Sequence, residues 1–204
     1  MEDTALQTLR AMFSNPIATR GLDHHTFGFG RGLTGEFESL GSPLDETRMY
    51  VFAGILVIFS TKTRVTETEF NNFLKFAEEN GYANGILIAS PSNASDRVLG
   101  ILRDYVSNRE NPLVQIVEIR QLQFDKSRHR MVSPHRIITT AEADAMMKEF
   151  NVEALTQLPK IDCQDAMAAW IGARPGDVVE ISGLCESSAD NLRWRYCVAD
   201  VTNG

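Results

Sequence analysis

Cysteine is scarce in this chain of 204 residues, and the spacing of its cysteines is not typical of either a zinc site or a disulfide framework. The three cysteines, Cys163, Cys185 and Cys197, are 22 and 12 residues apart, and no CxxC pair occurs. A standard zinc ribbon is therefore excluded, and a disulfide scaffold is disfavoured. Each cysteine lies in an apolar or strand-like context, where we expect an inert buried thiol in a reducing compartment.

Long apolar runs are also absent. The longest, from Val51 to Phe59, has nine residues, about half the length of a membrane-spanning helix. The chain does not open with a basic region followed by an apolar stretch, as a secretory signal would. With 43% hydrophobic residues it can still build a core. We therefore expect a soluble intracellular protein with one domain or two small ones and no membrane partner.

Positive charge is in short supply, especially toward the C-terminus. Residues 141–204 contain 5 basic and 11 acidic side chains, whereas residues 1–140 contain 15 and 16. A chain with a net negative charge gains little from counterion release, so tight DNA binding by the chain alone is disfavoured. The exception is the basic stretch Arg120–Arg136, in which Asp125 is the one acidic residue. It could touch phosphates within a larger assembly, or it is a solvated connector between domains.

Recognisable catalytic and metal-binding motifs are missing as well. Gly30–Gly35 matches the string GxGxxG, but no strand pattern leads into it and no helical pattern follows. A flexible glycine-rich loop is therefore a better interpretation than a dinucleotide site. No GxSxG elbow occurs, and none of the histidines has metal-ligand spacing: His24, His25, His129 and His135. We expect no cofactor, no metal and no catalytic residue.

Residues 46–122 are predicted to form an α/β domain. Thr66 and Glu69 fit a capping box that begins one helix, Gly81 closes it, and a second apolar stripe runs over Val98–Val106. Three apolar runs alternate with these helices and are typical of buried strands: Met49–Phe59, Ile86–Ala89 and Leu113–Ile119. The order predicts a central parallel or mixed sheet flanked by helices.

The flanking regions are less regular. Residues 1–45 are predicted to hold a short helix, ended by Pro16, and a mobile glycine-rich segment over 21–41. Four residues give the helix one apolar face: Leu6, Leu9, Met12 and Phe13.

Residues 123–204 are predicted to form a small α+β domain. Two helices are expected. The first spans Thr140–Phe150 with Thr139 or Thr140 as its cap, and the second spans Gln164–Ile171 and ends at Gly172. Two strands are expected at Val178–Ile181 and Trp194–Val198, separated by a polar loop at Ser187–Asn191.

The turn Ser90–Arg97 is a second candidate binding surface beside the basic stretch. It precedes a predicted helix, whose free backbone amides can take a phosphate, and Arg97 adds positive charge. The alternative is an ordinary helix cap, with Ser92 or Asn93 as the capping residue.

A series of motifs in the C-terminal part resembles a known family. In order, they are Gln123–His135 (QFDKSRHRMVSPH), Gln157–Ile161 (QLPKI), Asp165, Gly172, Gly176–Val179 (GDVV) and Trp194–Val198 (WRYCV). Together they resemble the C-terminal assembly domain of the fifth subunit of eukaryotic RNA polymerases, which has a small counterpart in archaeal RNA polymerases. The α/β pattern of residues 49–119 is similar to the N-terminal jaw domain of the eukaryotic subunit.

The resemblance implies a non-catalytic subunit of a DNA-directed RNA polymerase. Its fold would be an α/β jaw-like domain plus a small α+β assembly domain, with the assembly domain docked on the largest subunit and the jaw beside downstream duplex DNA. The implied docking residues are His135, Leu158, Pro159, Ile161, Trp170 and Val179, for which core packing is the alternative role. The implied DNA-proximal residues are Arg97, Lys62 and Arg64.

The sequence departs from the family pattern at several positions. The V-P-x-H element appears as Val132-Ser-Pro-His135, and Asp165 is followed by Ala166 where the family has proline. Glu180, Ser182 and Gly183 stand where the family commonly has basic residues. Such divergence fits a distant eukaryote, a specialised paralogue or a large DNA virus, so the expected location is the nucleus, the nucleolus included, or a cytoplasmic viral factory or virion.

Two alternatives belong to other functional classes. One is a free-standing regulatory module that binds polymerase transiently. The other is a small-molecule enzyme that uses the Gly30–Gly35 loop as its phosphate site, which the missing strand–turn–helix context disfavours.

Overall fold

The computed structural model describes residues 1–14, 28–29, 33, 35–129, 131–185 and 189–199. The chain divides into two compact units. The first contains the N-terminal helix and residues 29–126, and the second contains Gly28 and the residues from Ser127 onward. In this division the N-terminal helix belongs with the first sheet, whereas the sequence pattern predicted a separate segment over residues 1–45. None of the described helices is long and apolar enough to cross a membrane.

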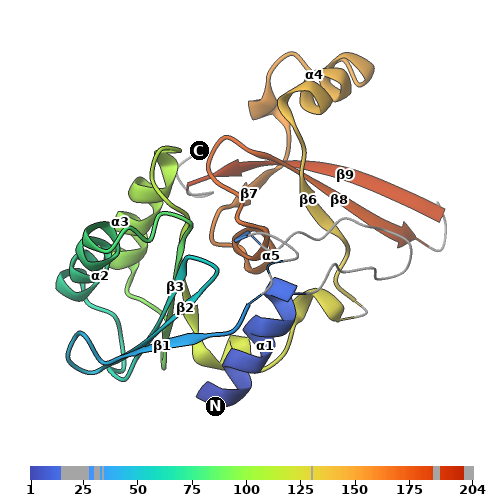
Figure 1. Cartoon of the computed structure of the whole chain (residues 1–204). Helices are drawn as coiled ribbons and strands as arrows, with labels where there is room; N and C mark the ends of the chain where they lie inside the picture. Colours follow the sequence, from blue (N-terminus) through green and yellow to red (C-terminus); the bar gives the residue numbers. More distant parts are fainter. Residues whose placement is uncertain (15–27, 30–32, 34, 130, 186–188, 200–204) are drawn as a thin grey trace. The chain divides into compact units, whose positions relative to one another are not determined.

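The first unit is built on a mixed five-stranded sheet in the order β1-β2-β3-β4-β5 (Figure 1). The strands are β1 (Glu38–Gly41), β2 (Thr47–Phe52), β3 (Ile55–Ser60), β4 (Ile86–Ser90) and β5 (Val114–Glu118). The pairs β1–β2 and β2–β3 are antiparallel, and the pairs β3–β4 and β4–β5 are parallel. The predicted mixed sheet is therefore confirmed.

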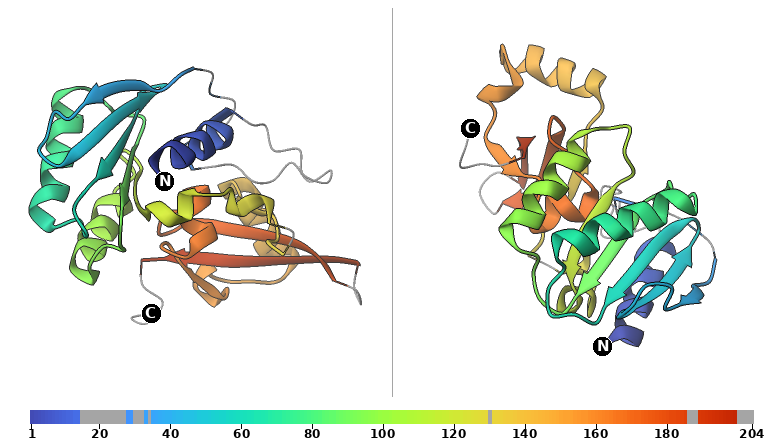
Figure 2. Two further views of the ribbon diagram at one scale, coloured as in Figure 1. Left: turned by 90° about the horizontal axis from the view of Figure 1, so that it is seen from below. Right: turned by 90° about the vertical axis from the view of Figure 1, so that its left-hand side faces the viewer.

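Helices cover both faces of this sheet (Figures 1 and 2). The two crossover helices, α2 (Glu67–Glu79) and α3 (Asp96–Ser107), lie on one face, and α1 (Glu2–Ser14) lies on the other. The Phe13 ring of α1 stacks on Phe52 of β2 with centroids 4.9 Å apart. Because both faces are covered, every residue of β3 and of β4 is buried, which explains their uninterrupted apolar sequence. A short 3₁₀ helix, η1 (Ile119–Leu122), follows β5.

The helix ends follow local sequence signals. Thr66 and Glu69 form the predicted capping box of α2, and Gly81 has a φ of +73° just beyond the helix end. The cap of α3 was predicted at the wrong residue. Neither Ser92 nor Asn93 caps this helix; instead the Ser95 hydroxyl accepts from the Val98 N–H at 3.4 Å.

The prediction of one strand over Met49–Phe59 is wrong, because the run folds back on itself. Phe52 pairs with Ile55, so Ala53 and Gly54 are the two central residues of a hairpin turn. Their φ values are +49° and +81°, and a type I′ turn requires a positive φ at both positions. Periodicity could not locate this turn, because apolar residues continue through it.

The glycine-rich segment also differs from the prediction. Part of it, Glu38–Gly41, forms edge strand β1, with all four residues exposed. An exposed strand has no apolar alternation to reveal it, and its hydrogen bonds to β2 decide its conformation. His24, His25, Gly30 and Gly32 lie outside the described residues.

The second unit has a four-stranded sheet in the order β6-β8-β9-β7. Its strands are β6 (His135–Ile137), β7 (Lys160–Asp162), β8 (Val178–Cys185) and β9 (Ala189–Val198). The β8–β9 hairpin is longer than predicted, and Ala189–Asn191 of the expected loop belong to β9. The short strands β6 and β7 were not predicted, because three residues are too few to show a period.

Helices lie on opposite faces of this second sheet (Figure 1). On one face α4 (Thr140–Glu149) contributes Ala143 and Met146 to a cluster with Ile138 and Val178. The other face carries α5 (Ala166–Ile171), whose Asp165 cap accepts from the Met167 and Ala168 N–H groups. Two further 3₁₀ turns are η2 (Lys126–Arg128) and η3 (Leu155–Gln157).

The hairpin turn gives the first testable prediction. Ala53→Asn should stabilise the protein by about 0.5 kcal/mol, because asparagine tolerates positive φ better than alanine. Gly54→Ala should destabilise it by about 1–2 kcal/mol, since the new Cβ would be strained and would lie 2.5 Å from Asn84 Nδ2, which donates to the Ala53 carbonyl. Urea unfolding measures both. Equal effects of the two variants would contradict the turn assignment.

The α4 cap gives a second prediction. Hydrogen bonds from Thr139 and Arg136 lower the pKa of Glu142 to about 2. A depressed carboxyl pKa contributes stability above its unfolded pKa of about 4.3, and that contribution is lost as the pH falls toward 2. Glu142→Gln should therefore lower stability at pH 7 by less than about 1 kcal/mol, because the site is exposed, and the difference should vanish near pH 2. Thermal unfolding as a function of pH measures it.

Glu149 provides the control for this comparison, because it lies at the other end of α4 and has no ion pair among the described residues. Glu149→Gln should not reproduce the loss at pH 7, since removing a negative charge near a helix C-terminus relieves an unfavourable dipole interaction. A loss equal to that of Glu142→Gln would show that the capping box contributes nothing specific.

Candidate functional site

Lys62, Arg64 and Arg97 lie at the same edge of the first sheet. Lys62 and Arg64 lie in the loop that follows β3, and Arg97 is in the first turn of α3, which follows β4. Because β3 and β4 are parallel, both connections leave the sheet at its carboxyl edge. The fold therefore gathers the three predicted DNA-proximal cations, although 33 residues separate Arg64 from Arg97.

Carboxylates neutralise much of this positive charge. Lys62 Nζ lies 2.6 Å from Glu69 Oε1 and 3.2 Å from Glu46 Oε2, and hydrogen bonds to these two groups raise the pKa of Lys62. Arg97 Nε lies 2.7 Å from Glu67 Oε2. Within the described part of the chain, Arg64 is in no ion pair. These acidic partners lie on β-strand connections and on α2, so the sequence pattern did not reveal them.

The predicted docking residues of the second unit divide into two groups. Ile161, Trp170 and Val179 are 7%, 4% and 0% exposed. Ile161 and Val179 lie on the same face of the sheet by strand register, and Trp170 belongs to the α5 helix that lies over that face. Their side chains pack inside the unit, which matches the alternative role that the sequence left open for them.

The other three predicted docking residues reach the surface. Pro159 is exposed, and its carbonyl accepts from the Tyr196 N–H at 2.9 Å, which anchors the loop beside β9. Leu158 is half-buried against the apolar cluster beneath α4. His135 is half-buried at the start of edge strand β6.

The charged form of His135 is disfavoured by its surroundings. Its Nδ1 lies 2.6 Å from the Ser133 carbonyl, so Nδ1 carries the hydrogen in the neutral ring. Burial lowers the pKa of His135, the hydrogen bond to Ser133 and the charge of Asp165 oppose that shift, and the nearby Arg195 and Arg193 reinforce it. The surroundings of His135 therefore favour its neutral form.

A charged network on the α4 face was missed by sequence reasoning. Arg136 donates from Nε to Glu180 and from a terminal nitrogen to Glu142, both at 2.7 Å. The Trp194 indole N–H donates to the second Glu180 oxygen at 3.2 Å. The network joins β6, β8, β9 and α4. Glu180 is thereby committed to partners inside the chain.

Three cations of the basic stretch Arg120–Arg136 have side-chain partners within the chain. Arg120 pairs with Glu118 at 3.6 Å, Lys126 donates to the Gln121 side chain, and Arg136 belongs to the network above. Arg130 lies outside the described residues. Local carboxylates therefore neutralise part of the charge that made this stretch a candidate phosphate surface.

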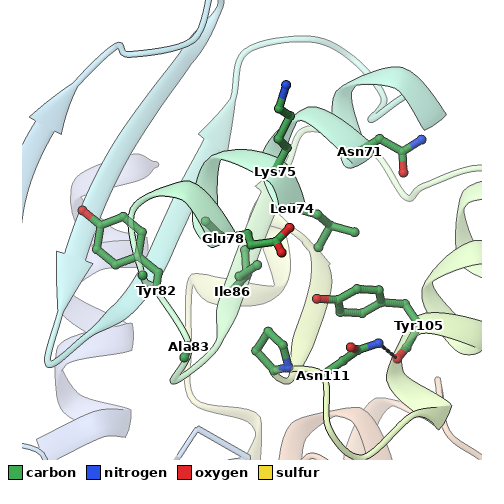
Figure 3. A pocket seen from close by; sticks show the side chains of 12 residues that line it. Asn71, Leu74, Lys75, Glu78, Tyr82, Ala83, Ile86, Tyr105 and Asn111 are labelled. Atoms are coloured by element: carbon green, nitrogen blue, oxygen red, sulfur yellow. Dashed lines mark hydrogen bonds between the residues drawn. The ribbon is translucent and has the colours of Figure 1, made fainter.

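A pocket of about 500 Å³ opens in the first unit between α2, α3 and the loops that precede β4 and β5 (Figure 3). Leu74, Tyr105 and Pro112 give it apolar walls, and Lys75 and Glu78 stand at its rim. Sequence reasoning did not find it, because its lining comes from four separate segments. Among the described residues no group of three or more His, Cys, Asp or Glu side chains could hold a metal ion.

Comparison with known proteins identifies the second unit. Residues 124–197 match the family described as RNA polymerase Rpb5, C-terminal domain. The DNA-directed RNA polymerase subunit Rpo5 of Sulfolobus acidocaldarius is 33% identical over 76 residues, which are 37% of this chain and 89% of the relative.

Two other archaeal relatives agree with this match. Subunit Rpo5 of Sulfurisphaera tokodaii is 30% identical over 79 residues, 39% of this chain and 93% of the relative. Subunit Rpo5 of Archaeoglobus fulgidus is 31% identical over 77 residues, 38% of this chain and its own entire length. The resemblance inferred from the motifs is confirmed, and through its C-terminal unit the chain belongs to the Rpb5 family of RNA polymerase subunits.

Proposed function

We propose that this chain is a non-catalytic subunit of a DNA-directed RNA polymerase. Its second unit docks on the largest subunit, and its first unit lies beside the downstream duplex DNA. The observation that carries the proposal is the match of the second unit to nearly the whole length of archaeal subunits named Rpo5. A location where transcription takes place follows, which is the nucleus in a eukaryote and a viral factory or virion in a large DNA virus.

Surface exposure limits which of the predicted docking residues can contact the largest subunit directly. Pro159 lies on the surface, Leu158 and His135 are partly accessible, and all three belong to the unit that matches the family. Ile161, Trp170 and Val179 support docking indirectly, because they fix the sheet and α5 that present these residues. The acidic balance of residues 141–204 fits a protein partner better than a nucleic acid.

The carboxyl edge of the first sheet supports proximity to DNA. Arg64 is the strongest candidate for a phosphate contact, because none of the described carboxylates neutralises it. Arg97 and Lys62 must give up their glutamate partners to bind phosphate, so their contributions are smaller and more sensitive to salt. This unit therefore adds to DNA held by an assembled polymerase and does not bind DNA tightly alone.

Docking is tested on the tagged full chain purified from its own cells at high salt. The wild type should retain the two largest polymerase subunits at equal stoichiometry. Pro159→Asp should reduce that retention several-fold, because a charge placed in a protein interface must be desolvated. Asn72→Asp introduces the same charge on exposed α2 and is the matched control. Equal retention by both variants would remove Pro159 from the docking surface.

The same purification separates the proposal from the alternative of a free-standing regulator. A regulator that binds transiently should elute before the largest subunits at high salt, and its amount should fall below theirs. A wild-type chain that elutes alone, or with partners outside transcription, would overturn the subunit assignment.

Proximity to DNA is tested with assembled polymerase that carries Arg64→Gln and Arg97→Gln. Retention of downstream duplex DNA should weaken, and the slope of its logarithm against the logarithm of salt concentration should fall by about 1 for each phosphate that the variant no longer binds. Subunit composition should not change. Lys75→Gln, at an exposed lysine on α2, controls for the removal of any surface cation. An unchanged slope would remove these residues from the DNA path.

A further inference from the structure

Most of the outer edge of β9 has no partner strand among the described residues. Strand β7 pairs only with Tyr196–Val198, the C-terminal end of this strand. Residues Ala189–Arg195 continue the ladder with β8 on the inner side, but no described strand pairs with them on the outer side. The hairpin therefore extends as a two-stranded arm beyond β6 and β7 (Figures 1 and 2).

The strand register defines which backbone groups point outward. The Cys197 N–H donates toward β8, to the Asp177 carbonyl, so by the alternation of the ladder the backbone N–H and C=O groups of Arg195 and Arg193 also face β8. The intervening residues point away from β8. Tyr196 shows this, because its N–H donates outward to Pro159. The backbone N–H and C=O groups of Leu192 and Trp194 therefore point to the outer edge. No described strand forms hydrogen bonds with these outward groups.

The side chains along this edge differ between the two faces. Leu192 is 46% exposed and lies on the same face as Trp194, whose ring packs against exposed Phe150 with centroids 5.0 Å apart. Arg193 and Arg195 alternate with them and lie on the opposite face. Among the described residues neither arginine has an ion pair, although Arg195 donates to the Lys160 carbonyl at 3.0 Å.

We propose that the outer edge of β9 at Leu192–Trp194 binds an extended segment of a partner protein as an added strand. The segment alternates apolar residues, which pack on Leu192, Trp194 and Phe150, with acidic residues, which face Arg193 and Arg195. The inference rests on the proposed function, because the partner is a polypeptide of the polymerase assembly. It deepens that function by naming the mode of contact and the chemistry of the contacting segment.

A strand satisfies this surface better than a nucleic acid does. The open edge offers carbonyl acceptors as well as N–H donors, and only another peptide backbone supplies both in register. Phosphates could pair with the two arginines, but they would leave the carbonyls and the apolar face without partners. The acidic balance of residues 141–204 also repels a polyanion.

A matched pair of variants at one position separates backbone from side-chain contacts. Leu192→Ala removes the apolar side chain and keeps the outward N–H. Leu192→Pro also removes the N–H, and because that group takes no part in the β8–β9 ladder, an edge strand can accept proline there. In high-salt purification of the full chain from its own cells, Leu192→Pro should retain the largest polymerase subunits about tenfold less well than Leu192→Ala.

Hydrogen exchange gives a second measurement that needs no variant. In the free chain the amides of Leu192 and Trp194 should exchange faster than those of Arg193 and Arg195, which lie inside the ladder. In the purified complex the protection of Leu192 and Trp194 should rise by about tenfold or more, while the two arginine amides change little. Uniform protection of all four amides would indicate burial without an added strand and would overturn the proposal.

Charge reversal tests the polarity of the segment. Arg193→Glu should weaken retention several-fold and Arg193→Lys should not, if acidic residues face this side of the strand. The outcomes distinguish failure of the proposed function from failure of the strand-addition proposal. If wild type loses the polymerase subunits, the proposed function fails. If wild type retains them and Leu192→Pro matches Leu192→Ala, the function stands and the strand-addition proposal is wrong.

Discussion

The ladder between β8 and β9 is the interaction on which the second unit depends. Each of the other two strands of that sheet pairs with one member of this hairpin, and no strand pairing connects β6 to β7 among the described residues. Helix α4 packs on one face of the hairpin through Val178, and α5 lies over the other. Because β6 and β7 have only three residues each, pairing with the long hairpin fixes their register and stabilises them.

Several cations of this protein pair with carboxylates of the same unit. Lys62 and Arg97 pair with glutamates around α2, and Arg136 pairs with Glu142 and Glu180 across β6, α4 and β8. Such pairs orient side chains and contribute little net stability at exposed sites. Their functional consequence is larger, since Arg64 in the first unit and Arg193 and Arg195 in the second have no carboxylate partner among the described residues.

Local signals in the sequence predicted much of the fold. The capping boxes at Thr66 and Thr139 and the left-handed glycine after α5 act within a few residues, so they could be recognised without the tertiary structure. The hairpin turn at Ala53–Gly54 could not, because the apolar pattern runs through it without a break. The strands β1, β6 and β7 were missed because exposed or very short strands depend on their partners.

The sequence by itself determined the family, the alternation of buried strands and helices in the first unit, and the apolar residues available for each core. These properties depend on residue types and spacings that can be recognised in the linear sequence. Only the tertiary structure decided that Ile161, Trp170 and Val179 are internal and that Glu67 and Glu69 neutralise Arg97 and Lys62. It also decided that no described strand pairs with the outer edge of β9 before Tyr196. Exposure, ion pairing and strand pairing depend on contacts between segments far apart in the chain, and a single sequence does not specify their register.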